Sequence, residues 1–295
     1  MQTRYRAAAT ALLLTATGGL AATGGAAEAS GTHHDRAGAN PTLVITIKSK
    51  AHAVKLSQDT LRPGNTIFKV RNMAGKASKG LIQIVRFRHG YTLLDAQSDI
   101  PAAFGGDTAA VARVDDGMVF YGGMQAKGDR SKVSKWAVRI DKPGTYFVVN
   151  FDRGNFTTLT AKGNKQRRAH PKATGFINAV TSSNDAGNDF KAGKGMPHRG
   201  WMSTENKAKE PHFVELGQVK KGTTDADVQA SFEGGPDPSV PGGGHAGTGV
   251  ISPGHTFIWA YHVPKGRYAA LCFWPSLMTG APHGVMGMHA VFNLS

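Results

Sequence analysis

The stretch GRYAALCFWPSLMTGAPHGVMGM, residues 266–288, decides how the rest of the chain is interpreted. It opens with a glycine and Tyr268 leading into an apolar run, a pattern typical of a buried β-strand that begins at a turn. The run ends at Cys272, the only cysteine of the 295 residues. A loop follows and carries His283 and Met288. We therefore expect a strand to end at the cysteine, and one loop to supply a histidine and a methionine beside it.

Two blocks of the C-terminal half have counterparts earlier in the chain. KPGTYFVVNF at 142–151 is similar to PKGRYAALCF at 264–273, and GLIQIVRFRHG at 80–90 is similar to HFVELGQVKKG at 212–222. A threonine and an aspartate follow the second block in both halves, as Thr92 with Asp95 and as Thr224 with Asp227. A repeat of this length indicates a duplicated domain rather than a solenoid unit.

The two copies differ at chemically important positions. Where the second copy has His212 and Cys272, the first has Gly80 and Asn150. Nothing in residues 152–162, which follow Asn150, supplies a further histidine and methionine. The first copy is therefore expected to fold like the second without holding a metal of the same type.

Short apolar runs separated by Gly, Pro and Asp clusters predict an all-β protein of sandwich or barrel type. A short helix is expected at 91–96. The expected strands are 42–47, 66–72, 80–87, 133–140, 144–151, 156–162, 176–182, 200–206, 212–219, 256–263, 266–273 and 288–295. The basic, Pro-containing segment 166–172 predicts a linker between a first domain at 42–165 and a second at 173–295.

The first 29 residues have the features of a secretory signal peptide: basic residues, an apolar region and the cleavage pattern Ala27-Glu28-Ala29. Residues 30–41 are polar and Gly-rich, which predicts a flexible lead-in. We expect an exported protein, secreted or in the cell envelope, with no transmembrane segment after cleavage. His33 and His34 could bind copper or nickel, but two solvated side chains are the favoured interpretation because no other ligand flanks them.

A lone cysteine in an exported protein is a liability unless it is capped, buried or bound to a metal. A buried inert thiol is the ordinary interpretation, but His212, His283 and Met288 favour a metal ligand. Two imidazoles, a thiolate and a long axial thioether form the donor set of a blue-copper site. We predict one copper ion, bound by His212, Cys272, His283 and Met288. A half-buried structural role for His212 and a metal-free cluster are the alternatives.

At these residues the chain resembles the cupredoxin superfamily, small Greek-key β-sandwiches that carry blue copper. The resemblance covers most of 173–295 and, in fold, more weakly 42–165. It implies two tandem Greek-key sandwiches and the same four ligands. The glycine before Met288, and its spacing from His283, favour Met288 over Met286 as the axial ligand. Ten residues separate Cys272 from His283, a longer loop than in the small members, and nearer to that of copper nitrite reductases.

The sequence favours one-electron transfer over catalysis. Blue-copper enzymes pass electrons through a histidine next to the cysteine, but Leu271 and Phe273 flank Cys272. The chain also has no His-x-His pairs. We therefore predict that the protein is not an enzyme. The alternatives are a copper carrier or scavenger, and a metal-free interaction module.

The formal net charge of +15 suggests a redox partner with an acidic surface. Nucleic-acid binding is not expected, because the basic residues are scattered and no RNP-like aromatic motif is present. Met278, Pro282, Val285 and Met286 surround His283 in the sequence. They have two interpretations: simple loop packing, or an apolar docking patch around an edge-exposed ligand.

Overall fold

The computed structural model describes residues 42–48, 54–74, 80–126, 132–151, 153–166 and 169–295. The expected signal peptide and the segment 30–41, including His33 and His34, lie outside the described residues. Two residues of the expected linker, 167 and 168, lie outside them too.

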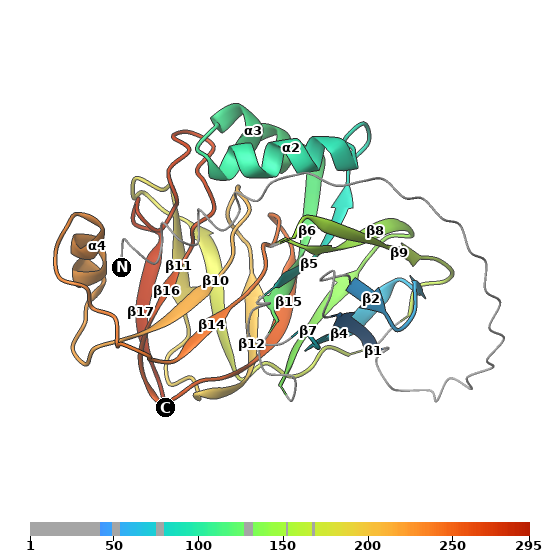
Figure 1. Cartoon of the computed structure of the whole chain (residues 1–295). Coiled ribbons are helices and arrows are strands. Elements are labelled where there is room, and N and C mark those ends of the chain that lie inside the picture. Colours follow the sequence, from blue (N-terminus) through green and yellow to red (C-terminus); the bar gives the residue numbers. More distant parts are fainter. Residues whose placement is uncertain (1–41, 49–53, 75–79, 127–131, 152, 167–168) are drawn as a thin grey trace.

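The described chain is built mainly of β-strands, which confirms the all-β prediction (Figure 1). In the first half the elements are β1 (Thr42–Ile47), β2 (Val54–Leu56), β3 (Thr60–Leu61), β4 (Gly64–Asn72), β5 (Leu81–Phe87), α2 (Leu93–Phe104), α3 (Thr108–Gly117), β6 (Met118–Gln125), β7 (Val133–Ile140), β8 (Gly144–Asn150) and β9 (Asn155–Ala161). In the second half they are β10 (Gly175–Thr181), β11 (Asn188–Ala192), β12 (Arg199–Glu205), β13 (Glu215–Val219), α4 (Asp225–Phe232), β14 (His245–Gly247), β15 (Thr256–His262), β16 (Gly266–Leu271) and β17 (His289–Leu294).

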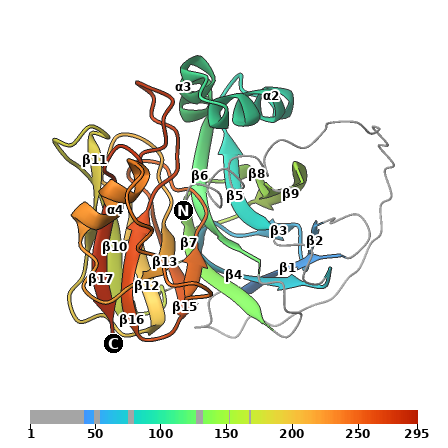
Figure 2. The same cartoon turned by 60° about the vertical axis from the view of Figure 1, so that its left-hand side comes forward.

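Three sheets form two sandwiches that share a sheet (Figures 1 and 2). The largest has the order β11-β10-β12-β15-β7-β4-β1-β2 and takes strands from both halves. The sheet β3-β9-β8-β5-β6 belongs to the first half, and β14-β13-β16-β17 belongs to the second. The halves meet where β15 pairs with β7, and Trp259 lies opposite Trp136. The domain boundaries that we expect from the sequence stay a prediction, with β9 ending at 161 and β10 beginning at 175.

Alternating burial explains why these residues form strands. In β1 the side chains of Leu43, Ile45 and Ile47 are fully buried, while the residues between them are more accessible. Side chains on a strand point to opposite faces, so such a pattern buries one face only. Trp136 on β7 stacks on Phe68 of β4, with ring centroids 5.2 Å apart. These aromatic rings anchor the shared sheet within one hydrophobic core that includes residues of both halves.

The register of the strands supports the duplication seen in the sequence. In the first half Val85 of β5 lies opposite Phe147 of β8. Their sequence counterparts in the second half, Gly217 of β13 and Ala269 of β16, also lie opposite each other. The pairing of the two blocks is therefore the same in both copies.

The helix that follows each block is capped in the same way. The Thr92 side chain accepts from the Asp95 backbone N–H, and the Asp95 side chain accepts from the Thr92 N–H. Thr224 and Asp227 form the same capping box at the start of α4. The repeated threonine and aspartate are thus helix starts, a role that we did not assign to them from the sequence.

Helices α3 and α4 and strands β2, β3, β6, β11 and β14 are not among the expected elements, and α2 is longer than the expected helix at 91–96. β6 contains Gly122 and Gly123, which weaken a strand pattern in sequence. None of the described helices has the length and apolar composition that a membrane crossing requires.

The first copy offers a stability test at Asn150. Its side chain is buried, and neither Oδ1 nor Nδ2 has a hydrogen-bond partner among the described residues. An unsatisfied buried amide costs about 1–3 kcal/mol. We expect Asn150→Val to leave the free energy of unfolding unchanged or to raise it by about 1 kcal/mol.

Asn206→Val is the matched control for this test. The Asn206 amide is also buried, but it donates to the carbonyls of Glu210 and Ile251 and accepts from the Ala208 N–H. Its removal should lower the unfolding free energy by about 2 kcal/mol or more. Equal losses in both variants, measured by denaturant unfolding, would show that Asn150 is satisfied in solution.

Candidate metal centre

Three of the four expected ligands meet in the second half of the chain. The Nδ1 or Nε2 atoms of His212 and His283 and the Sγ atom of Cys272 lie within 4.8 Å of one another. Cys272 Sγ is 3.6 Å from His212 Nδ1 and 3.9 Å from His283 Nδ1. The three residues expose 1%, 0% and 0% of their surface for His212, Cys272 and His283 respectively. Distant parts of the sequence thus bring two ring nitrogens and a sulfur to one buried point.

Each of the three residues is fixed by backbone contacts. Cys272 directly follows β16. His212 lies before β13, and its backbone N–H and C=O both bond to Ile251, at 3.1 and 2.8 Å. The His283 N–H donates to the Trp274 carbonyl at 3.0 Å. A Cβ atom on Gly284 would lie 2.9 Å from the Cys272 carbonyl oxygen, so only glycine allows the loop to return this closely.

The position of Met288 agrees with its expected role without testing it. Its side chain is fully buried, and its N–H donates to the His283 carbonyl at 2.9 Å. Met286 is only half-buried, and its sulfur accepts from the hydroxyl of exposed Thr279 at 3.2 Å. The choice of Met288 as the axial ligand stays a prediction.

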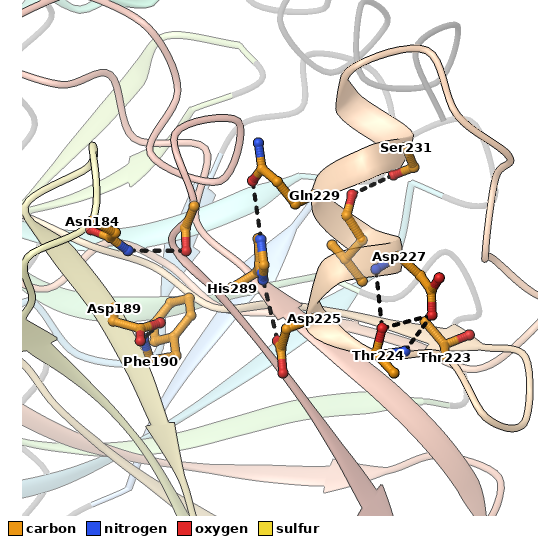
Figure 3. A network of polar contacts seen from close by, with 12 residues as sticks. Asn184, Asp189, Phe190, Thr223, Thr224, Asp225, Asp227, Gln229, Ser231 and His289 are labelled. Carbon is orange, nitrogen blue, oxygen red and sulfur yellow. Dashed lines mark hydrogen bonds and ion pairs between the residues drawn. The ribbon is translucent and has the colours of Figure 1, made fainter.

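Helix α4 holds the end of the ligand loop (Figure 3). His289, which follows Met288, contacts Asp225 through Nδ1 and Gln229 through Nε2, each at 3.2 Å. The Gln229 amide also donates to the Val285 carbonyl at 3.2 Å. From the other side, the Asn184 amide donates to the Gly287 carbonyl at 3.1 Å. These contacts fix the loop that carries His283 and Met288.

Glu210 contacts the candidate site, and sequence reasoning did not single it out. One of its carboxylate oxygens, Oε2, accepts from His283 Nε2–H at 3.1 Å and from the Leu277 N–H at 2.9 Å. A carboxylate on the outer nitrogen of a ligating histidine fixes the tautomer and the ring orientation. Here it leaves Nδ1 of His283 facing the sulfur. The available signal was a carboxylate two residues before His212, in a segment already singled out for its histidine.

The pKa values of the two imidazoles are shifted in opposite directions. Burial lowers the pKa of His212 well below its ordinary value of 6.5, so the ring is neutral. Its Nε2 has no partner among the described residues. Burial would also lower the pKa of His283, but contacts with Cys272 and Glu210 outweigh it and raise the pKa to about 9. A metal bound through Nδ1 of His283 would take the place of a proton on that nitrogen.

The pKa of the Glu210 carboxyl group, which contacts the His283 ring, is shifted downward. Burial would raise the pKa of Glu210, but hydrogen bonds from the His283 ring and the Leu277 N–H lower it overall. Glu210 is therefore ionised at neutral pH and keeps a negative charge beside the His283 ring.

The donor set fits a copper ion. Metal–nitrogen bonds of about 2.0 Å and metal–sulfur bonds of about 2.3 Å place the donors of a trigonal site roughly 3.5–3.7 Å apart. The two sulfur–nitrogen separations, 3.6 and 3.9 Å, are close to this value. Thiolate and imidazole together suit copper in both of its oxidation states.

Within the described part of the first copy, no His/Cys/Asp/Glu cluster of this kind lies at the equivalent place. A Cβ atom on Gly80 would lie 2.9 Å from Asn150 Oδ1, so these two residues are neighbours, as His212 and Cys272 are in the second copy. In the first copy the two equivalent positions are thus also neighbours, but they hold a glycine and the amide of Asn150 in place of an imidazole and a thiol.

Of the two interpretations of the loop around His283, the one with an edge-exposed ligand does not agree with the structure, because His283 is fully buried. The apolar side chains around it are exposed to different degrees: Met278 exposes 86% of its surface and Val285 39%, while Pro282 and Met286 are half-buried. The His283 ring instead faces Cys272 through Nδ1 and Glu210 through Nε2. The docking patch stays a prediction.

No family model and no curated protein sequence matches the chain. Solved structures do match. One is auracyanin A, a "blue" copper protein from Chloroflexus aurantiacus, with 12% identity, 42% of this chain and 100% of that chain covered, and a TM-score of 0.30. Another is dithionite-reduced auracyanin from Roseiflexus castenholzii, with 16% identity, 42% and 99% covered, and a TM-score of 0.25.

A copper-containing nitrite reductase from Thermus scotoductus matches across both halves, with 10% identity, 86% of this chain and 60% of that chain covered, and a TM-score of 0.24. These three neighbours are thus two auracyanins and a copper-containing nitrite reductase. Because these three TM-scores are below 0.5, the assignment of the metal rests on the donors of the chain itself.

Glu210→Gln tests the carboxylate behind His283. The variant keeps the shape of the side chain and removes its charge, so we expect copper affinity to fall about 10- to 100-fold. Competition with a copper chelator measures this. Glu205→Gln is the control, because Glu205 pairs with Lys207 on the surface. Unchanged affinity in Glu210→Gln would contradict the role of Glu210.

A pair of methionine variants tests the axial position. Met288→Leu should retain copper and shift its reduction potential, because the axial ligand tunes the potential of such sites. Met286→Leu should leave the potential unchanged. Voltammetry of both variants decides the assignment, and a larger shift for Met286→Leu would reverse it.

Proposed function

We propose that this chain is an exported one-electron carrier that binds one copper ion through His212, Cys272 and His283, with Met288 as the axial ligand. The observation that carries the proposal is the convergence of two ring nitrogens and one sulfur at a fully buried point. A bound copper ion would supply a one-electron couple between its two common oxidation states.

Rigid support of the ligands favours electron transfer over copper handling. Cys272 follows a strand, His212 is bonded on both backbone sides to Ile251, and the Glu210 carboxylate orients the His283 ring. A site held this firmly changes little when the charge of its metal changes. A carrier that releases its ion benefits from accessible ligands, whereas these three are closed off from solvent.

We propose further that the protein is not an enzyme, although copper enzymes are among its structural neighbours. The proposal is supported by the residues that flank Cys272, neither of which is a histidine able to pass electrons to a second metal. Export is supported by the pattern of the first 29 residues, and an acidic redox partner by the net charge of +15.

Metal content and a visible spectrum of the purified mature chain test the proposal. We expect about one copper per chain and an intense thiolate-to-copper charge-transfer band, which Cys272→Ser abolishes. Absence of copper binding, or binding unchanged in Cys272→Ser, would remove the copper function and favour an interaction module.

Voltammetry separates the two copper functions. A reversible wave, with copper retained in both oxidation states, supports electron transfer. Loss of copper(I) to an external chelator of moderate affinity supports copper handling instead.

A further inference from the structure

The edge of the first half is bonded directly to a segment of the second half. Strand β6 contacts residues 248–252 through several backbone bonds. The Gly122 N–H donates to the Val250 carbonyl at 2.9 Å, and the Ser252 N–H donates to the Phe120 carbonyl at 3.0 Å. The Phe120 N–H in turn donates to the Ser252 hydroxyl at 2.9 Å. The segment therefore extends the sheet of the copy that lacks metal donors.

The same segment holds a metal ligand on its other side. Ile251 forms an antiparallel bridge with Tyr121 of β6 and another with His212. A short ladder thus runs from the first half, through Ile251, to the backbone of His212. Any shift of residues 248–252 relative to β6 is transmitted to this ligand.

Gln83 joins β6 to this segment. Its side chain is fully buried on β5. Its Nε2 donates to the carbonyls of Gly122 at 3.0 Å and Val250 at 2.9 Å, and its Oε1 accepts from the Val250 N–H at 2.7 Å. A Cβ atom on Gly249 would lie 2.2 Å from Gln83 Oε1, so the segment can approach the amide only with glycine there.

β6 also supports the cysteine side of the site. The ring of Trp274, two residues after Cys272, packs against Phe120 of β6 with centroids 5.3 Å apart, and against Phe104 of α2 at 5.5 Å. Figures 1 and 2 show α2 and α3 beside the loop between β16 and β17. The first half therefore contacts both segments from which the donors come.

We propose that Gln83, in the half without metal donors, is a positioning residue for the ligand His212. This inference rests on the proposed copper function. The amide fixes Val250, the neighbouring Ile251 fixes the His212 backbone, and the ring nitrogen is thereby held at its distance from the sulfur. The metal-free copy is in this sense a part of the metal centre.

The test replaces Gln83 with methionine in the full chain, which keeps the length of the side chain and removes its hydrogen bonds. In the metal-free protein, we expect amide hydrogen exchange at Ile251 and His212 to accelerate about tenfold or more, while the amides of β16 keep their protection. In the copper-loaded protein, we expect a shifted charge-transfer band and an altered copper hyperfine splitting in electron paramagnetic resonance.

Ile84→Val on the same strand is the control, because it removes a buried methylene and leaves in place the Ile84 carbonyl, which also accepts from Gln83 Nε2 at 3.1 Å. It should lower the melting temperature and leave the spectrum and the exchange at Ile251 unchanged. Should Gln83→Met not fold, Gln83→Glu replaces it, because it has the same length and keeps an acceptor for the Val250 N–H.

The possible outcomes separate the two hypotheses. A wild-type chain without a charge-transfer band contradicts the proposed function, and the exchange rates of the metal-free protein then still test the role of Gln83. A wild-type chain with the band, and a Gln83 variant with a lower melting temperature but unchanged spectrum and exchange, overturns the positioning role.

Discussion

The burial of two imidazoles and one thiol at a common point is the constraint on which the rest of the structure depends. Polar groups withdrawn from water are costly unless they find partners. At this point they face one another, and their nitrogen and sulfur atoms lie within 4.8 Å. A metal ion with affinity for both nitrogen and sulfur is the partner that satisfies all three at once. The loop after Cys272, the carboxylate of Glu210 and helix α4 all act to keep these side chains in place.

The duplication explains why much of the described chain contributes no donor to the candidate site. Both copies have the same strand register and the same helix cap, but one has Gly80 and Asn150 where the other has His212 and Cys272. The first copy, which has Gly80 and Asn150 at these positions, supports the second. It contributes half of the shared sheet, and its edge strand β6 bonds to the segment behind His212.

Local patterns made much of this predictable from sequence. Alternation at Leu43, Ile45 and Ile47 marks a strand, and the lone Cys272 with the histidines around it marks the site. The contribution of Gln83 could not be predicted, because its partners at Gly122 and Val250 are distant in sequence. The burial of His283 depends on how a ten-residue loop folds, and the role of Glu210 depends on where that loop brings the ring. Both are properties of the tertiary structure, and the periodicity of apolar residues in the sequence carries no information about them.

X-ray absorption at the copper edge of the loaded protein tests the central claim most directly, because it reports the atoms bound to the metal. The account predicts one sulfur at about 2.1–2.3 Å and two nitrogens at about 2.0 Å, the ordinary bond lengths for such ligands. A first shell of nitrogen and oxygen atoms alone, with no short sulfur distance, would contradict it, since Cys272 would then not bind the copper that the chain holds.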